Sequence, residues 1–282
     1  MIWKKIQELE INIKKYLYGD FFGVYKTAFK GQGIDFTELK EYSFWDPIKN
    51  IDWNASAKHK RLFTKLYEQE RDLNVLFLLD IWASMHFWTK EKTKLKLLEE
   101  IFFLLAMCAQ HTNDSIWSLL FFDKEYIFFD FKKWEENIVK TIKTIHKKQA
   151  TTFWDLNQAI KYTQKLKIKE SLIFIITDDI EQHKWPLHTL QANNEIIYIN
   201  IFDPYENTWS DYFSLSLWGN KKSLHDFFIW WKQKRRFEQQ RKNKIKTLEK
   251  TLRKNRIDYL NLNTQSDIFG AFYKLFYMRW NN

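Results

Sequence analysis

Residues 76–85 read LFLLDIWASM, an apolar run that ends in Asp80 and is followed by a short segment containing Ser84. The run begins at residue 74, is rich in Leu and Phe, and shows no alternation of apolar and polar residues. This pattern is typical of a strand that is buried on both faces of a parallel sheet. The stretch therefore predicts a central strand whose polar residues gather where the strand ends.

Three more runs of the same kind follow, at residues 115–122, 171–178 and 195–202. Helix-like stretches separate them, and these are Lys94–Gln110, Trp134–His146, Leu156–Leu166 and Pro186–Ala192. A last strand, around Ile257–Leu262, and a last helix, Asp267–Tyr277, end the pattern. This alternation predicts an α/β fold, a three-layer αβα arrangement with a doubly wound, mostly parallel sheet covered by helices on both sides.

The composition fits a folded chain with a sizeable core. Of its 282 residues, 45% are apolar and 28% are charged, which argues against gross disorder. No apolar run reaches the roughly 18–20 residues that a membrane-crossing helix needs, and the start of the chain lacks the apolar centre of a signal peptide. We therefore expect no membrane span and a cytoplasmic location. The single cysteine, Cys108, excludes an internal disulfide and any multi-cysteine metal site.

One segment carries the whole net charge of +10, because fourteen basic and only three acidic residues lie between Lys221 and Arg256. The segment has no Pro or Gly and predicts a long helix. It is either a solvated helix face or a contact surface for an acidic partner, nucleic acid or anionic lipid. Because it matches no nucleic-acid motif, we expect a protein partner. The candidate partner-binding residues are Lys234, Arg235, Arg236 and Arg241.

Oxygen-bearing side chains stand where the predicted central strands end. Asp80 ends the first strand, Ser84 follows it, and Asp178 ends the third, while Thr151 and Thr152 lie just before the helix that precedes the third strand. Hard cations such as Mg²⁺ prefer such ligands. The alternative interpretation is that the two aspartates only cap the helices that follow them.

The segment before the first buried strand carries a more specific pattern: GQGIDFTELKEY (31–42), IDWNASAK (51–58) and LYEQER (66–71), followed by LFLLDIWASM (76–85). These motifs resemble the von Willebrand factor A-like family called domain of unknown function 58 (DUF58). The resemblance implies a family-specific segment over 1–72 and a von Willebrand factor A-like domain over 73–282, with a basic helical insertion at 221–256. Within the first segment, we predict that Asp52 is a helix cap or ion-pair partner and Trp53 a packing anchor.

Proteins that resemble von Willebrand factor A domains carry a metal-ion-dependent adhesion site (MIDAS), with an Asp-x-Ser-x-Ser motif, a threonine and a second aspartate. By this resemblance, Mg²⁺ would be held by Asp80, Ser84, Thr151 and Asp178. The sequence departs from the pattern at Trp82, which stands where the first serine of the motif would lie and offers no oxygen.

The resemblance implies a non-catalytic interaction module, an adaptor or chaperone-like partner of a MoxR-type AAA+ ATPase. No catalytic residue is assigned, and the chain has no P-loop, no Gly-x-Ser-x-Gly elbow and no His-Glu-x-x-His pair. Three alternatives stay open: a Mg²⁺-dependent hydrolase or phosphatase that uses Asp80, a nucleic-acid-associated protein acting through the basic helix, and a relative whose metal site is inactive.

Tryptophan is abundant and glycine scarce, with 14 and 6 residues respectively. Several tryptophans stand where the resembling family usually has glycine, and these are Trp45, Trp88, Trp117, Trp134 and Trp154, with Trp82 as a further candidate. One hypothesis is that the source organism reads the codon UGA as glycine, whereas this sequence was translated with UGA as tryptophan. The alternative is a tryptophan-rich composition caused by A/T-biased codons.

Peptide mass spectrometry of the protein from its native source tests the recoding hypothesis. We expect glycine at the positions written here as Trp45, Trp88 and Trp117, because glycine suits tight turns with positive φ and tryptophan does not. Trp53 serves as the internal control, since it belongs to the Ile-Asp-Trp motif and is tryptophan in either case. Tryptophan at all three test positions contradicts the hypothesis.

Overall fold

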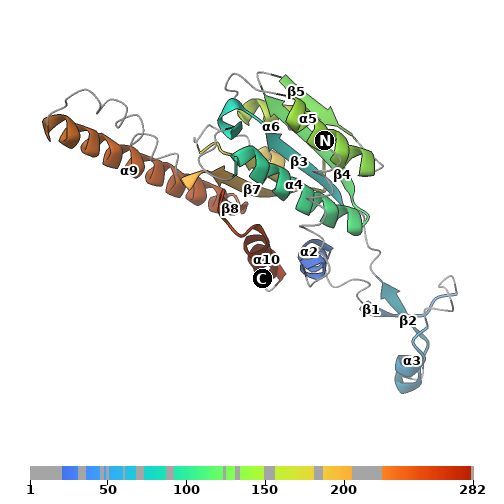
Figure 1. Ribbon diagram of the computed structural model, residues 1–282. Coiled ribbons are helices and arrows are strands. Elements are labelled where there is room, and N and C mark those ends of the chain that lie inside the picture. The colour runs from blue at the N-terminus through green and yellow to red at the C-terminus, as the bar shows by residue number, and fades with distance from the viewer. Residues whose placement is uncertain are drawn as a thin grey trace.

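The computed structural model centres on a six-stranded sheet with the strand order β5-β4-β3-β6-β7-β8 (Figure 1). The strands are β3 (Asn74–Asp80), β4 (Ser115–Phe122), β5 (Glu125–Phe129), β6 (Ser171–Thr177), β7 (Asn194–Phe202) and β8 (Asp258–Asn263). The structure describes residues 21–30, 36–44, 48, 51–59, 61–67, 73–86, 92–122, 125–130, 134–148, 156–180, 187–204 and 224–280.

All neighbouring strands of this sheet are parallel except β4 and β5, which pair antiparallel. The mostly parallel α/β sheet predicted from the apolar runs is therefore confirmed. β5 was not predicted, because its residues are exposed or half-buried at the sheet edge and give no continuous apolar signal.

Helices cover both faces of the sheet. Apart from α2, which was not predicted, their bounds lie within a few residues of those predicted. One face carries α2 (Phe21–Lys30), α4 (Lys94–His111), α5 (Trp134–Lys147) and α10 (Ile268–Trp280). The other face carries α6 (Leu156–Lys165), α7 (Leu187–Gln191) and the inner end of α9 (Leu224–Lys254).

Alternate residues of β3 explain why its sequence is apolar throughout. Val75, Phe77 and Leu79 join the core cluster under α4 and α10, whereas Leu76 and Leu78 join the cluster under α6 and α9. Successive side chains of a strand point to opposite faces, so a strand covered on both sides must be apolar at every position. Polar side chains are thereby confined to the ends of the strand.

The N-terminal region contributes to two separate parts of the structure. α2 belongs to the main core, where the ring of Phe276 in α10 lies 5.6 Å from that of Tyr25 and 5.2 Å from that of Phe29. β1 (Phe36–Glu41) and β2 (Phe63–Tyr67) instead form their own antiparallel pair, and α3 (Trp53–His59) lies between them in sequence (Figure 1).

The two predictions made for the start of α3 have different outcomes. Asp52 is a helix cap as predicted, because its Oδ1 accepts hydrogen bonds from Asn54 N at 2.9 Å and Ala55 N at 3.0 Å. The prediction that Trp53 anchors the packing is wrong, because its side chain is 65% exposed. Trp53 is the first residue of a short helix whose only buried residue is Ser56, so its ring has no apolar layer to enter.

The long basic helix predicted before the last strand is α9, which extends well beyond the sheet (Figure 1). Leu248 and Leu252, near its C-terminal end, are buried against the sheet. Among the described helices, none is long and apolar enough to cross a membrane.

Replacement of Phe276 by alanine tests the role of the α2–α10 contact. Phe276 is fully buried among aromatic rings, so we expect Phe276→Ala to lower the free energy of unfolding by about 3–5 kcal/mol in urea titrations. Met278→Ala, two residues away and exposed, is the matched control and should change it by no more than about 0.5 kcal/mol. Equal effects of the two substitutions contradict this packing.

Candidate functional site

The candidate site lies at the carboxyl ends of β3 and β6, which are adjacent and central in the sheet. From β3 the chain proceeds to β4 on one side, and β6 lies on the other side, so this is the point where the strand order reverses. Ligands of open α/β sheets bind in the crevice at such a point. A short 3-10 helix, η2 (Ala83–His86), follows β3 directly.

Asp80 joins the ends of the two strands through its carboxylate. Its Oδ2 accepts a hydrogen bond from Thr177 Oγ1 at 2.6 Å, and its Oδ1 accepts one from Trp82 N at 3.0 Å. Thr177 Oγ1 in turn accepts a hydrogen bond from Asp179 N at 3.0 Å. Asp80 is fully buried, so it both fixes the turn after β3 and holds β3 against β6.

The electrostatic surroundings of Asp80 disfavour its charged form. Burial raises the pKa of Asp80 well above its ordinary value, and the negative charge of Asp178 raises it further. The hydrogen bonds from Thr177 and from the backbone of Trp82 lower the pKa and offset only part of this effect. A positive charge placed near Asp80 would relieve the imbalance.

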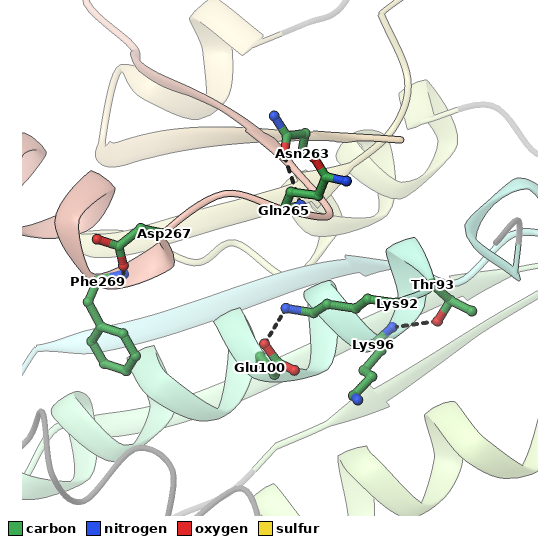
Figure 2. A network of polar contacts seen from close by, with 8 residues as sticks. All are labelled: Lys92, Thr93, Lys96, Glu100, Asn263, Gln265, Asp267 and Phe269. Atoms are coloured by element: carbon green, nitrogen blue, oxygen red, sulfur yellow. Dashed lines mark hydrogen bonds and ion pairs between the residues drawn. The ribbon is translucent and has the colours of Figure 1, made fainter. Parts of the chain in front are cut away.

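Asp178, the second predicted aspartate, forms an ion pair that the sequence analysis did not predict. Lys94 Nζ lies 2.5 Å from Asp178 Oδ2, and both side chains are almost fully buried. Lys94 is the first residue of α4, which is capped by Thr93 through a hydrogen bond from Lys96 N at 3.0 Å (Figure 2). The neighbouring Lys92 pairs instead with Glu100 of the same helix.

Three buried polar atoms on the segment after β3 have no hydrogen-bond partner among the described residues. They are Trp82 Nε1, Ser84 Oγ and His86 Nε2. The Trp82 ring packs edge-on against Phe121, with the ring centroids 6.0 Å apart. Trp82 therefore belongs to the core under α6 and α9, while the hydroxyl of Ser84 is a donor and acceptor that the described residues leave unused.

The donor set fits a hard cation such as Mg²⁺, provided that Lys94 leaves Asp178. Asp80 and Asp178 supply carboxylates and Ser84 supplies an unpaired oxygen. The fourth predicted ligand, Thr151, lies outside the described residues, as does Thr152. The described part of the chain has no group of three or more His, Cys, Asp or Glu side chains that could hold a metal. The expected ligand set contains only two side chains of these types, Asp80 and Asp178.

The structure bears on the recoding hypothesis at three tryptophans. In the described residues, the non-glycine positions with positive φ are Asn113, Lys167, Glu170 and Arg256. None of Trp82, Trp117 and Trp134 is among them, so the backbone at these three positions does not require glycine. Trp45, Trp88 and Trp154 lie outside the described residues.

A second polar cluster lies beside the segment after β3. Glu99 of α4 is buried, and its Oε1 lies 2.8 Å from His146 Nε2 of α5. Burial lowers the pKa of His86 in η2, and the negative charge of Glu99 offsets part of this shift. The sequence analysis missed this cluster because the three residues come from three separate elements.

The predicted partner-binding residues all lie in α9, which reaches the carboxyl edge of the sheet at β7. Arg236 is exposed, and the guanidinium carbon of Arg241 lies 5.9 Å from the centroid of the Phe202 ring at the end of β7. Lys234 and Arg235 lie in the same helix. The structure therefore brings Asp80 and Asp178 together, and it places the basic residues on a separate element, which contacts the end of β7 at Arg241.

The raised pKa of Asp80 predicts how its replacement depends on pH. The folded protein holds this proton more tightly than the unfolded chain, so its stabilising contribution is present below the ordinary pKa of about 4 and is lost as pH rises through the folded-state value. Asp80→Asn stays neutral. We therefore expect its stability relative to the unmodified protein to increase between about pH 5 and about pH 8, measured by urea unfolding in EDTA.

The control for this experiment is Asp130→Asn, because Asp130 is exposed. Its stability relative to the unmodified protein should be the same at both pH values. If Asp80→Asn behaves like Asp130→Asn, the carboxylate of Asp80 is not destabilised by its surroundings.

Comparison with known proteins gives relatives that are themselves without an assigned function. Three curated proteins, two from strains of Mycobacterium tuberculosis and one from Mycobacterium bovis, are each 21% identical over 204 residues. The match covers 71% of this chain and 64% of each relative, so the chain spans less than two thirds of their length. Residues 38–221 match the family described as "Protein of unknown function DUF58". This match covers well over half of the chain, which therefore belongs to the DUF58 family.

Proposed function

We propose that this protein is a non-catalytic interaction module with a von Willebrand factor A-like sheet, whose contact site is the carboxyl edge around Asp80, Ser84 and Asp178. The observation that carries this proposal is the meeting of Asp80 and Asp178 at the point where the strand order reverses, followed by Ser84, whose buried hydroxyl has no partner among the described residues. A buried polar atom without a partner calls for an explanation, such as a bound ion or an ordered water.

The proposed ligand is a Mg²⁺ ion of the MIDAS type, held by Asp80, Ser84 and Asp178 together with Thr151. A cation there would supply the positive charge that the raised pKa of Asp80 indicates is lacking. Mg²⁺ usually keeps some of its coordination positions free of protein ligands. A carboxylate of the partner would fill one of them, which makes partner binding dependent on metal.

The surroundings of Asp80 favour interaction over the alternative of a hydrolase or phosphatase. A nucleophilic carboxylate must reach its substrate with a free oxygen. Asp80 is fully buried, and each of its oxygens already accepts a hydrogen bond. These constraints suit a structural ligand that orients a cation, rather than an attacking group.

The proposed partner is a MoxR-type AAA+ ATPase, with a cytoplasmic complex in which this protein acts as adaptor or chaperone-like component. This part rests on the resemblance of the sequence motifs. α9 offers a second contact surface for an acidic region of the partner, because Arg236 is exposed and the helix extends well beyond the sheet (Figure 1). A nucleic-acid partner would instead reveal itself by binding that weakens steeply with salt.

Substitution of Ser84 tests the proposed contact site with little risk to folding. Because Ser84 Oγ makes no hydrogen bond to the described residues, Ser84→Ala should change the free energy of unfolding by no more than about 0.5 kcal/mol. We expect it to reduce capture of an AAA+ ATPase from native lysate in Mg²⁺ to the level that the unmodified protein shows in EDTA. Captured proteins are identified and quantified by mass spectrometry.

The matched control is Ser118→Ala in β4, since Ser118 Oγ is also buried and without a partner in the described part of the chain, but lies in the middle of a strand. This variant should capture the ATPase as the unmodified protein does. If the unmodified protein, Ser84→Ala and Ser118→Ala all capture the same proteins with and without Mg²⁺, the site around Ser84 is not a metal-dependent interface. α9 would then be the next surface to mutate.

A further inference from the structure

Lys94 occupies a position that is unfavourable for a lysine in two respects. Its side chain is almost fully buried, although removal of an ammonium group from water is costly unless it is paired. It is also the first residue of α4, whose N-terminus carries a partial positive charge and favours acidic side chains. A lysine at this place therefore depends on the negative charge that faces it.

One such negative charge is Asp178, which is one of the proposed cation ligands. The Lys94 ammonium lies 2.5 Å from Asp178 Oδ2, so it pairs with an oxygen that a divalent ion would also need. Two buried carboxylates, Asp80 and Asp178, repel each other across this edge of the sheet. The ammonium of Lys94 supplies one positive charge to this group of charges.

We propose that Lys94 is an internal competitor for the divalent cation at this site. In the metal-free protein the ammonium holds Asp178, and a cation binds only when Lys94 releases that carboxylate. This inference rests on the proposed cation site and adds to it the residue that sets its affinity.

The competition couples metal binding to partner binding. A buried Lys94 ammonium that leaves Asp178 loses the negative charge of that carboxylate, and a further negative charge nearby would compensate for this loss. A partner that brings a carboxylate to the cation provides that charge beside the same helix. Metal and an acidic partner therefore strengthen each other's binding, because each favours the state in which Lys94 is released.

A titration with Mn²⁺, followed by its electron paramagnetic resonance signal, measures the competition directly. We expect Lys94→Gln, which keeps a polar side chain but removes the charge, to bind Mn²⁺ at least about tenfold more tightly than the unmodified protein, because the competing ammonium is gone. Lys96→Gln is the matched control: Lys96 is exposed, lies two residues further along α4, and contributes only its backbone N–H to the Thr93 cap (Figure 2). It should bind Mn²⁺ as the unmodified protein does.

Equal Mn²⁺ affinity of Lys94→Gln, Lys96→Gln and the unmodified protein overturns the proposal. If Lys94→Gln does not fold in EDTA, its refolding on addition of Mn²⁺ is measured instead by circular dichroism, together with Lys94→Met. Refolding by Mn²⁺ supports the proposal, since the metal then replaces the missing charge. Failure of Mn²⁺ to restore either variant contradicts it.

The experiment separates this inference from the proposed function. Tighter Mn²⁺ binding by Lys94→Gln, without metal-dependent capture of an ATPase, supports the role of Lys94 and contradicts the proposed partner. Metal-dependent capture together with unchanged Mn²⁺ affinity supports the interaction module and contradicts the role of Lys94.

Discussion

The burial of β3 and β6 on both faces is the constraint on which the rest of this structure depends. Apolar side chains from two helical layers cover these strands, so no polar group is tolerated along most of their length. Polar chemistry is therefore concentrated where the strands end. The hydrogen bond from Thr177 to Asp80 lies at that boundary and joins the two central strands.

The balance of charge at this edge connects the fold to the proposed function. Asp80 and Asp178 place two negative groups in surroundings that exclude water, and Lys94 offsets one of them from the start of α4. Such an arrangement has two ways to become neutral, by an internal ammonium or by an external cation. If the proposed cation binds here, a partner that favours one of these two states would shift the balance between them.

Sequence reasoning succeeded where a residue's role is decided by its own segment. The buried strands and the helices between them follow from continuous apolar runs and helical periodicity, and Asp52 caps the helix that it precedes. It failed where the role of a residue depends on contacts with other parts of the folded chain. Trp53 belongs to a clear motif but has no apolar layer to enter, and β5 is half-exposed at the edge and gives no apolar signal.

The sequence by itself determined the α/β architecture and placed Asp80, Ser84 and Asp178 at the ends of central strands, because strand burial and strand ends leave a local pattern. Only the tertiary structure decided that Lys94 pairs with Asp178, which lies 84 residues further along the chain. The physical reason is that an ion pair depends on distance in space. A lysine at the start of a helix gives the same sequence signal whether its ammonium faces water or a buried carboxylate.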